Sequence, residues 1–361
     1  MKRRQFLESL CGSLAVLGPL SGPGPDGPFA VGDSRRLRNW TWVNGRREAS
    51  LEGWLRLFSP VQAAGITGVL VSGSSELPAR AAHDLGLEFQ RWIWTLNRNG
   101  DAWVRENHPE WFTVSRDGKS SLEHPPYVDY YRWLCPTRAS VRDYLKSEVS
   151  QIASAPDVDG VHLDYVRHCD VILPVGLWTK YNLVQDREYP EFDFCYCDVC
   201  RAVFREQTGR DPLESLDPTA DAEWREFRWN GVTALVRALT DAVHARGKQI
   251  SAAVFPTPTV ARRLVRQAWD EWPVDAFFPM IYHSFYNEPV QWIGEATAEG
   301  VAALPAAKPL FSGLYLPQLT PEELGTAVGL ARGAGAAGVS LFEVGGLSDD
   351  RLRSLRESLH G

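Results

Sequence analysis

Ionisable side chains gather in residues 157–169, with the sequence DVDGVHLDYVRHC. Residues 157–160 have the composition of a turn, and residues 160–164 alternate so that His162 and Asp164 share one face of a short strand. An acidic residue at the end of such a strand is typical of a catalytic carboxylate at the C-terminal rim of a parallel barrel. The alternative is an Asp that only begins the next loop or pairs with Arg167. We take Asp164 as the principal candidate for catalysis.

A second carboxyl group is expected if the chemistry is glycoside hydrolysis, because one acid protonates the leaving oxygen and another acts as nucleophile or activates water. Glu343 is the second candidate catalytic residue. It follows a predicted strand at residues 337–342 and precedes Gly345 and Gly346, which would let a sugar approach the backbone. The alternation of side chains along the predicted strand does not require Glu343 to face the site. Glu343 is equally open to being an ordinary charged residue in the loop.

Candidate substrate-binding residues stand at other predicted strand ends. Aromatic faces suit sugar rings, and the chain contains 14 Trp. We expect Arg167 to lower the pKa of Asp164 and so to keep that carboxyl ionised. His162 is equally open to a purely hydrogen-bonded role inside the barrel. The candidate substrate-binding residues are Trp42, Trp94, Asn97, His162, Arg167, Tyr282 and His283.

Three cysteines fall within six residues, at Cys195, Cys197 and Cys200. Thiols this close do not easily form unstrained disulfides with one another, but their spacing can wrap a tetrahedral ion. Cys135 or Cys169 would supply the fourth ligand. Four thiolates would close the coordination shell, so we expect a structural zinc and no cofactor for catalysis. One or two disulfides formed after export are the alternative.

The first 30 residues have the pattern of an export signal. Arg3 and Arg4 precede Phe6 and Leu7 in a twin-arginine motif, and an apolar run and a Gly- and Pro-rich stretch follow. The apolar run is too short to span a bilayer. We therefore expect a bacterial protein that reaches the periplasm or the cell exterior by a twin-arginine route, with no membrane association after signal removal. The alternative is a disordered basic N-terminus.

The rest of the chain, residues 31–361, alternates strand-like and helix-like segments, which predicts a single (β/α)8 TIM barrel. Long insertions follow the third and fourth strands, and the second insertion, residues 169–221, carries the cysteine run. An open doubly wound sheet would need a glycine-rich phosphate turn after the first strand, and none is present. The eight strands are expected at residues 37–43, 67–72, 87–95, 160–164, 249–255, 274–281, 309–316 and 337–342.

Two signatures resemble those of the glycosyl-hydrolase-like family 10 group of exported barrel proteins. Residues 159–167, DGVHLDYVR, are similar to its DGIHFDYVRYP signature, and residues 274–282, VDAFFPMIY, to its VDFVxPMxY signature. The resemblance spans residues 37–345 and implies a barrel of glycosidase ancestry.

The cysteine run resembles the zinc site of family 42 β-galactosidases, whose fourth thiolate stands where Cys135 stands here. This likeness implies Cys135, Cys195, Cys197 and Cys200 as the metal ligands. It departs at the fourth strand, where those enzymes have Asn-Glu and this chain has Leu163-Asp164. Their acid/base assignment therefore does not carry over.

The sequence predicts an exported glycoside hydrolase that cleaves O-glycosidic bonds in a polysaccharide or oligosaccharide, with Asp164 essential. Apolar residues at 44%, charged residues at 23% and a net charge of −7 are ordinary for a globular protein and give no reason to expect nucleic acid. Two alternatives stay open. One is a non-catalytic carbohydrate-binding barrel, and the other is a metal-dependent hydrolase that uses His162, Asp164 and His168.

Overall fold

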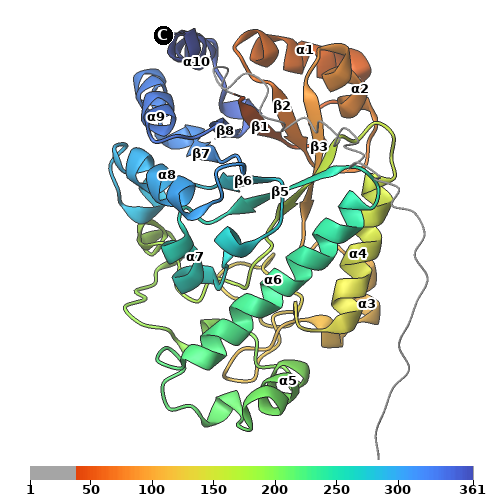
Figure 1. Ribbon diagram of the computed structural model, residues 1–361, viewed down its shortest axis with the longest axis vertical. Coiled ribbons are helices and arrows are strands. Elements are labelled where there is room, and N and C mark those ends of the chain that lie inside the picture. The colour runs from red at the N-terminus through yellow and green to blue at the C-terminus, as the bar shows by residue number, and fades with distance from the viewer. Residues whose placement is uncertain (1–37, 361) are drawn as a thin grey trace, which may run out of the picture.

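Eight parallel strands run in chain order around a barrel in the computed structural model, which describes residues 38–360 (Figure 1). The sheet order is β6-β5-β4-β3-β2-β1-β8-β7, and the parallel bridges Phe277–Leu310 and Met280–Gly313 bring its two ends together. The predicted (β/α)8 barrel is therefore confirmed, whereas the predicted signal, residues 1–30, lies outside the described residues. The strands are β1 (Trp40–Val43), β2 (Gly68–Val71), β3 (Glu88–Trp94), β4 (Gly160–Asp164), β5 (Gln249–Val254), β6 (Ala276–Pro279), β7 (Phe311–Tyr315) and β8 (Gly338–Phe342).

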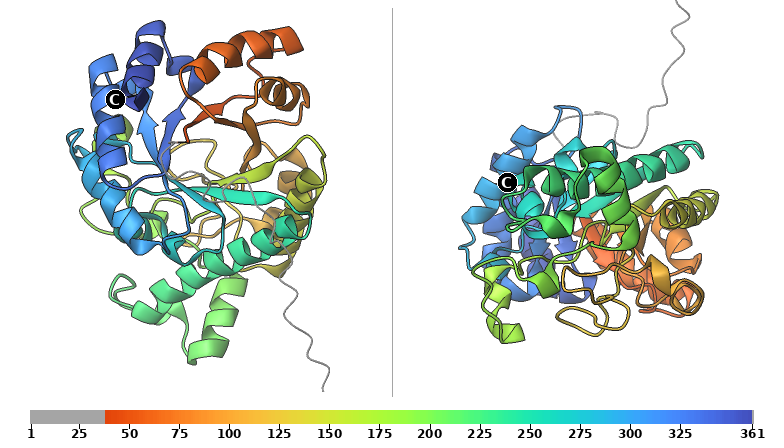
Figure 2. Two further views of the ribbon diagram at one scale, coloured as in Figure 1. Left: turned by 45° about the horizontal axis from the view of Figure 1, so that its top comes forward. Right: turned by 90° about the horizontal axis from the view of Figure 1, so that it is seen from below.

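Helices follow the strands and surround the barrel (Figure 2). Side-chain caps mark several of their starts: Ser50 accepts from Gly53 N at α1, and Thr320 and Glu323 form a capping box at α9. Within residues 38–360, no helix is both long and apolar enough to cross a membrane. The helices are α1 (Leu51–Ala63), α2 (Leu77–Asp84), α3 (Ala102–Asn107), α4 (Ala139–Ala153), α5 (Asp198–Thr208), α6 (Ala222–His244), α7 (Pro258–Val265), α8 (Trp292–Ala303), α9 (Pro321–Gly333) and α10 (Asp349–His360).

The barrel interior is filled by aromatic side chains. Trp40 and Trp42 of β1 are buried there and contact Phe278 of β6 at ring-centroid distances of 5.5 and 6.1 Å. Gly68 of β2 makes room for the Trp40 ring, because a Cβ at position 68 would lie 2.4 Å from it. The interior is thus a packed core that supports the strand ends above it.

His162 belongs to a hydrogen-bonded chain inside this core. Trp42 Nε1 donates to His162 Nε2 at 3.2 Å, and His162 Nδ1 lies 2.8 Å from Ser251 Oγ. The Ser251 hydroxyl donates to Gln90 Oε1 at 2.5 Å. Because the Trp42 N–H can only donate, Nε2 is an acceptor and the ring is neutral with its proton on Nδ1. Burial lowers the pKa of His162 to about 3.

We expect acid to destabilise the folded protein through His162. Its folded pKa of about 3 lies below its ordinary value of 6.5, so in this interval the unfolded chain binds a proton that the folded chain does not. The free energy of unfolding therefore falls as the pH drops from about 6.5 toward 3. When the pH is lowered from about 7 to about 4.5, the free energy of unfolding measured in urea should fall by roughly 2 kcal/mol less in His162→Gln than in the wild type. If the free energy of unfolding of His162→Gln depended on pH as that of the wild type does, this explanation would be contradicted. His168→Gln is the matched comparison, because burial also lowers the pKa of His168 to about 3.

The two long insertions stand at the C-terminal ends of the strands (Figures 1 and 2). The first, residues 95–138, joins β3 to α4 and contains α3, and the second, residues 165–221, joins β4 to α6 and contains α5. They contact each other through a bridge between Ser115 and Phe194 and through the Tyr196 N–H, which donates to Val114 O at 2.7 Å. The predicted insertions after strands three and four are therefore present and packed together.

Candidate active site

A cavity of about 280 Å³ lies among the C-terminal ends of the strands, between the two insertions and the loop after β6. Most of its wall is aromatic, and its charged side chains are Asp164, Arg167 and Asp170. An apolar hollow with a few polar groups is the usual form of a small-molecule site. The lining residues are Trp92, Trp94, Tyr127, Tyr131, Asp164, Tyr165, Arg167, Asp170, Leu173, Pro174, Leu177, Tyr181, Phe255, Met280, Tyr282, Phe285, Tyr286, Tyr315 and Phe342.

Asp164 ends β4 and presents its carboxyl to this cavity while remaining 91% buried, with an exposed fraction of 9%. Trp92 Nε1 donates to Asp164 Oδ2 at 3.0 Å, and the Tyr165 N–H donates to Oδ1 at 2.6 Å. Both bonds favour the carboxylate, but burial outweighs them and raises the pKa of Asp164 to about 6. A carboxyl with this pKa retains a proton at mildly acidic pH, as a general acid requires.

The predicted direction of the Arg167 effect is confirmed, but it does not keep the pKa of Asp164 low, because burial raises that pKa to about 6. The Arg167 charge does lower the pKa of Asp164, but its effect is smaller than those of burial and of the two hydrogen bonds. Arg167 instead pairs with Asp170, with Nη1 3.0 Å from Oδ2. Its charge is therefore largely committed to another carboxylate.

Arg167 and Asp170 form a buried ion pair in the cavity wall. The guanidinium lies between Trp133 and Phe255, with Cζ 4.8 and 4.9 Å from their ring centroids. Burial raises the pKa of Asp170, and the Arg167 charge opposes that effect. Asp170 is a site residue that was not predicted from the sequence. Its position six residues after Asp164, at i+3 from Arg167, was the available signal.

Tyr165 turns the chain sharply where β4 ends. Its φ of 50° is left-handed, a region that bulky L-residues seldom occupy and that is often found at functional sites. In this conformation its N–H reaches Asp164, and its ring packs against Trp94 with centroids 4.7 Å apart. The same turn therefore holds the carboxyl and builds the aromatic wall beside it.

Three of the predicted substrate-binding residues line the cavity, namely Trp94, Arg167 and Tyr282. Trp94 ends β3 and is 37% exposed, so its ring reaches from the cavity to the solvent. Tyr282 follows β6 and contacts Tyr315 with ring centroids 5.3 Å apart. The structure thus brings residues from strands three, four and six into one site with Asp164.

The other four predicted substrate-binding residues do not line this cavity. Trp42 and His162 lie in the barrel interior and bond to each other. Asn97 is buried in a bridge with Trp133 of the first insertion. His283 is buried at the start of a short turn, residues 283–286, where burial lowers its pKa.

Glu343 also lies outside the cavity lining. It follows Phe342, the last residue of β8, whose ring lines the cavity. The carboxyl forms an ion pair with Arg47 at 3.1 Å. Its surroundings are those of the loop charge considered above.

His162 and His168 do not gather with Asp164 around a metal position. Both nitrogens of His162 are engaged in the barrel interior. His168 is buried with neither nitrogen hydrogen-bonded, and the charges of Arg228 and Arg266 add to the burial that lowers its pKa. In the part of the chain that the structure describes, the side chains close enough to share an ion are those of the cysteine quartet.

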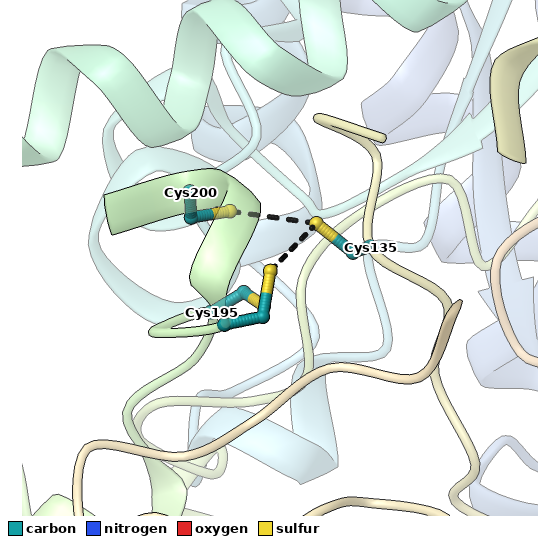
Figure 3. A group of neighbouring side chains, drawn as sticks. Cys135, Cys195 and Cys200 are labelled. Carbon is teal, nitrogen blue, oxygen red and sulfur yellow. Dashed lines mark hydrogen bonds between the residues drawn. The ribbon is translucent and has the colours of Figure 1, made fainter. Parts of the chain in front are cut away.

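Cys135, Cys195, Cys197 and Cys200 form this quartet. Figure 3 labels Cys135, Cys195 and Cys200. All four are buried, and their sulfur atoms lie within 4.8 Å of one another. Cys135 Sγ is 3.4 Å from Cys200 Sγ and 3.7 Å from Cys197 Sγ. Thiolates about 2.3 Å from a tetrahedral zinc stand about 3.8 Å apart, whereas disulfide sulfurs are about 2.0 Å apart. The quartet therefore has the geometry of a metal-binding group.

The quartet joins the two insertions that build the cavity. Cys135 belongs to the first insertion and the other three to the second, where Cys197 occupies the residue position just before α5. A helix N-terminus favours a thiolate. The Val114 N–H, also from the first insertion, donates to Cys195 Sγ at 3.5 Å. An ion held here would fix one insertion against the other.

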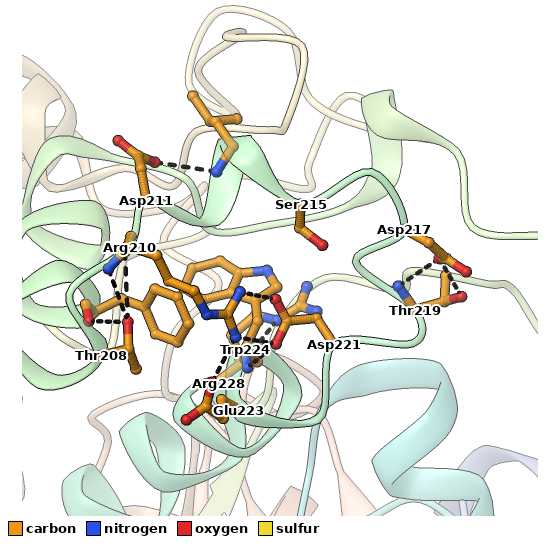
Figure 4. Close-up of polar contacts among 12 residues, drawn as sticks. Thr208, Arg210, Asp211, Ser215, Asp217, Thr219, Asp221, Glu223, Trp224 and Arg228 are labelled. Atoms are coloured by element: carbon orange, nitrogen blue, oxygen red, sulfur yellow. Dashed lines mark hydrogen bonds and ion pairs between the residues drawn. The ribbon is translucent and has the colours of Figure 1, made fainter.

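Ion pairs anchor the rest of the second insertion to α6 (Figure 4). Arg210 Nη2 donates to Asp221 Oδ1 at 2.7 Å, and the same carboxyl caps α6 by accepting from Trp224 N at 3.0 Å. Arg228 of α6 pairs with the buried Asp193. The middle and the C-terminal end of the insertion are thus fastened to α6.

No protein-family model matches the chain, and no curated protein matches it. Among solved structures, the glycoside hydrolase domain of PgaB (BpsB) from Bordetella bronchiseptica is similar at 13% identity and a TM-score of 0.60, over 90% of this chain and 99% of that one. The catalytic domain of β-amylase from Paenibacillus polymyxa gives 9% identity and a TM-score of 0.60, over 90% and 98%. α-L-Fucosidase isoenzyme 2 from Paenibacillus thiaminolyticus gives 14% identity and a TM-score of 0.55, over 90% and 49%. These likenesses show the fold, which is a (β/α)8 barrel.

Proposed function

We propose that this protein is a glycoside hydrolase that cleaves O-glycosidic bonds in a polysaccharide or oligosaccharide. The observation that carries the proposal is Asp164, a carboxyl with a raised pKa at the end of β4 in an aromatic cavity. This is the face of the barrel where enzymes of this fold place their active sites. The glycosidase-like neighbours and the resemblance to glycosyl-hydrolase-like family 10 support the same class.

Asp164 is the general acid in this proposal. Its proton would pass to the glycosidic oxygen as the bond breaks, and the hydrogen bonds from Trp92 and Tyr165 would hold the carboxylate that remains. Asp170 is the second carboxyl, because it lines the same cavity and its ion pair with Arg167 opposes the burial that raises its pKa and disfavours the ionised form. In that form it acts as nucleophile or as the base that activates water.

A carbohydrate-binding barrel without catalysis is the second candidate. The observation that favours it is the engagement of Asp170 by Arg167, which occupies one oxygen of the second carboxyl. The two functions are separated by incubating the wild type with a panel of defined bacterial and plant glycans and measuring both binding and release of reducing sugar. Release supports hydrolysis, whereas binding without release supports the binding barrel.

The pH dependence of the rate tests the role of Asp164. Because the acid must be protonated, kcat/KM should fall as the pH rises through about 6. Trp92→Phe removes a hydrogen bond that favours the carboxylate, so the pKa of Asp164 should rise. The alkaline limb of the pH profile of kcat/KM should then shift to higher pH by roughly half a unit to one unit. A limb that stays in place or moves to lower pH in Trp92→Phe would assign the titration to another group.

We also propose that the cysteine quartet binds a structural zinc, as in the family 42 β-galactosidases that the motif resembles. The support is the burial of four thiols at tetrahedral spacing. Such an ion has no open position, so it would hold the two insertions together and take no part in the reaction.

We propose in addition that the protein is exported by the twin-arginine route to the periplasm or beyond. The support is the motif at Arg3 and Arg4 and the apolar run after it. Arg3→Lys combined with Arg4→Lys should retain the protein in the cytoplasm of a bacterial host. Unchanged export of that double variant would remove the proposal.

A further inference from the structure

The cavity is walled on the side where the second insertion meets the loop after β6. Gly176, in the turn Val175–Leu177, packs directly on the backbone of the turn His283–Tyr286. A Cβ at Gly176 would lie 2.2 Å from Ser284 O and 2.8 Å from Phe285 O. The neighbouring Leu177 and Phe285 line the cavity. The two loops are therefore in direct contact on this side of the cavity.

Exposed aromatic surface leads out of the cavity at the end of β3. Tyr165 lines the cavity and packs on Trp94, which also lines it and is 37% exposed. Tyr130 of the first insertion is 40% exposed and lies beside Trp94, with ring centroids 6.1 Å apart. By contrast, Trp92 and Tyr282 in the cavity wall are only 8% and 7% exposed. The aromatic surface is therefore continuous from the cavity to the solvent on this side.

We infer that the cavity receives the terminal residue of a glycan chain, while Trp94 and Tyr130 stack against the next residue outside it. The inference rests on the proposed function and specifies its substrate as a chain end. The cavity volume of about 280 Å³ falls just below the range of about 300 to 1,000 Å³ for drug-sized ligands, which suits a single sugar ring. An internal segment of a chain would need two exits, and on one side of the cavity the two loops are in direct contact at Gly176.

The chain-length dependence of binding and cleavage tests the inference. The probes are malto-, cello-, chito- and xylo-oligosaccharides of one to six residues, with the full chain carrying Asp164→Asn for calorimetric binding and the wild type for product analysis. We expect affinity to increase from one residue to two and then to level off. We expect the wild type to shorten a hexasaccharide from one end only.

Tyr130→Ala tests the outer position separately from the cavity. Loss of one stacked ring should weaken binding of the disaccharide and longer probes about fivefold and leave monosaccharide binding unchanged. Trp103→Ala is the matched control, because Trp103 is 51% exposed but packs on His108, Trp111 and Tyr144, none of which lines the cavity. It should bind every probe as the parent does.

Three results would overturn the inference. They are internal cleavage of the hexasaccharide from the first turnover, affinity that keeps increasing through six residues, and equal behaviour of Tyr130→Ala and Trp103→Ala. Failure of the proposed function has a different signature, namely the expected length dependence of binding with no cleavage by the wild type. Absence of binding to all four series would overturn both.

Discussion

We expect Asp164→Asn to lower kcat/KM for the hydrolysed glycan by roughly 10²- to 10⁴-fold. The substitution keeps the shape of the side chain and can still accept a hydrogen bond from Trp92, but its amide N–H groups are too weakly acidic to protonate a leaving oxygen. Binding of the same glycan, measured by calorimetry, should change by less than about threefold. The loss should therefore appear in kcat, as expected for an interaction made in the transition state.

Stability separates this effect from a folding defect. The folded pKa of Asp164, about 6, lies above its ordinary value of 3.8, so above about pH 6 the buried carboxylate destabilises the folded state. Asp164→Asn removes that charge, and we expect its thermal midpoint at about pH 7.5 to equal or exceed that of the wild type. Glu343→Gln is the matched comparison. Its carboxyl also follows a barrel strand but pairs with Arg47 outside the cavity, so most of the wild-type rate should remain. A large loss of rate in Glu343→Gln, with most of the rate kept in Asp164→Asn, would assign the catalytic role to Glu343.

Removal of the metal from the cysteine quartet is expected to have the second large effect. Purified protein should contain one zinc per chain by mass spectrometry. Chelation or Cys200→Ser should lower the thermal midpoint by roughly 10 °C, because the buried thiols would lose the proposed zinc and its link between the two insertions. Activity should fall with it, since both insertions line the cavity. Proteolysis should cut within residues 95–138 and 165–221 before it reaches the barrel.

Cys169→Ala is the control for this prediction. Cys169 is buried in the same insertion but lies outside the quartet, so this variant should keep one zinc per chain. Protein without zinc whose Cys135–Cys200 pair is found as a disulfide by peptide mapping would contradict the zinc proposal and favour the alternative raised by the sequence.

The barrel and the position of Asp164 could be predicted from the sequence because both depend on local patterns. Apolar runs at regular spacing give the strands, and the alternation in residues 160–164 places Asp164 and His162 on the inner face. Glycine at position 160 and the turn before it set where β4 begins. These features are contained in a few neighbouring residues and need no tertiary information.

The rest of the site depends on contacts between distant segments. The partner of Arg167 could not be fixed without the fold, because either Asp164 or Asp170 satisfies the local spacing. The rise in the pKa of Asp164 comes from burial under both insertions, which no local pattern reports. For Glu343 the deciding contact is the ion pair with Arg47, which lies in the loop after β1, far from Glu343 in the sequence.

The most direct test of the central claim is a crystal structure of the Asp164→Asn protein with a glycan that the wild type hydrolyses. Our account predicts a sugar ring inside the aromatic cavity, with its glycosidic oxygen about 3 Å from the side chain at position 164. A glycan bound elsewhere on the barrel, with the cavity free of sugar, would contradict the assignment of this cavity as the active site.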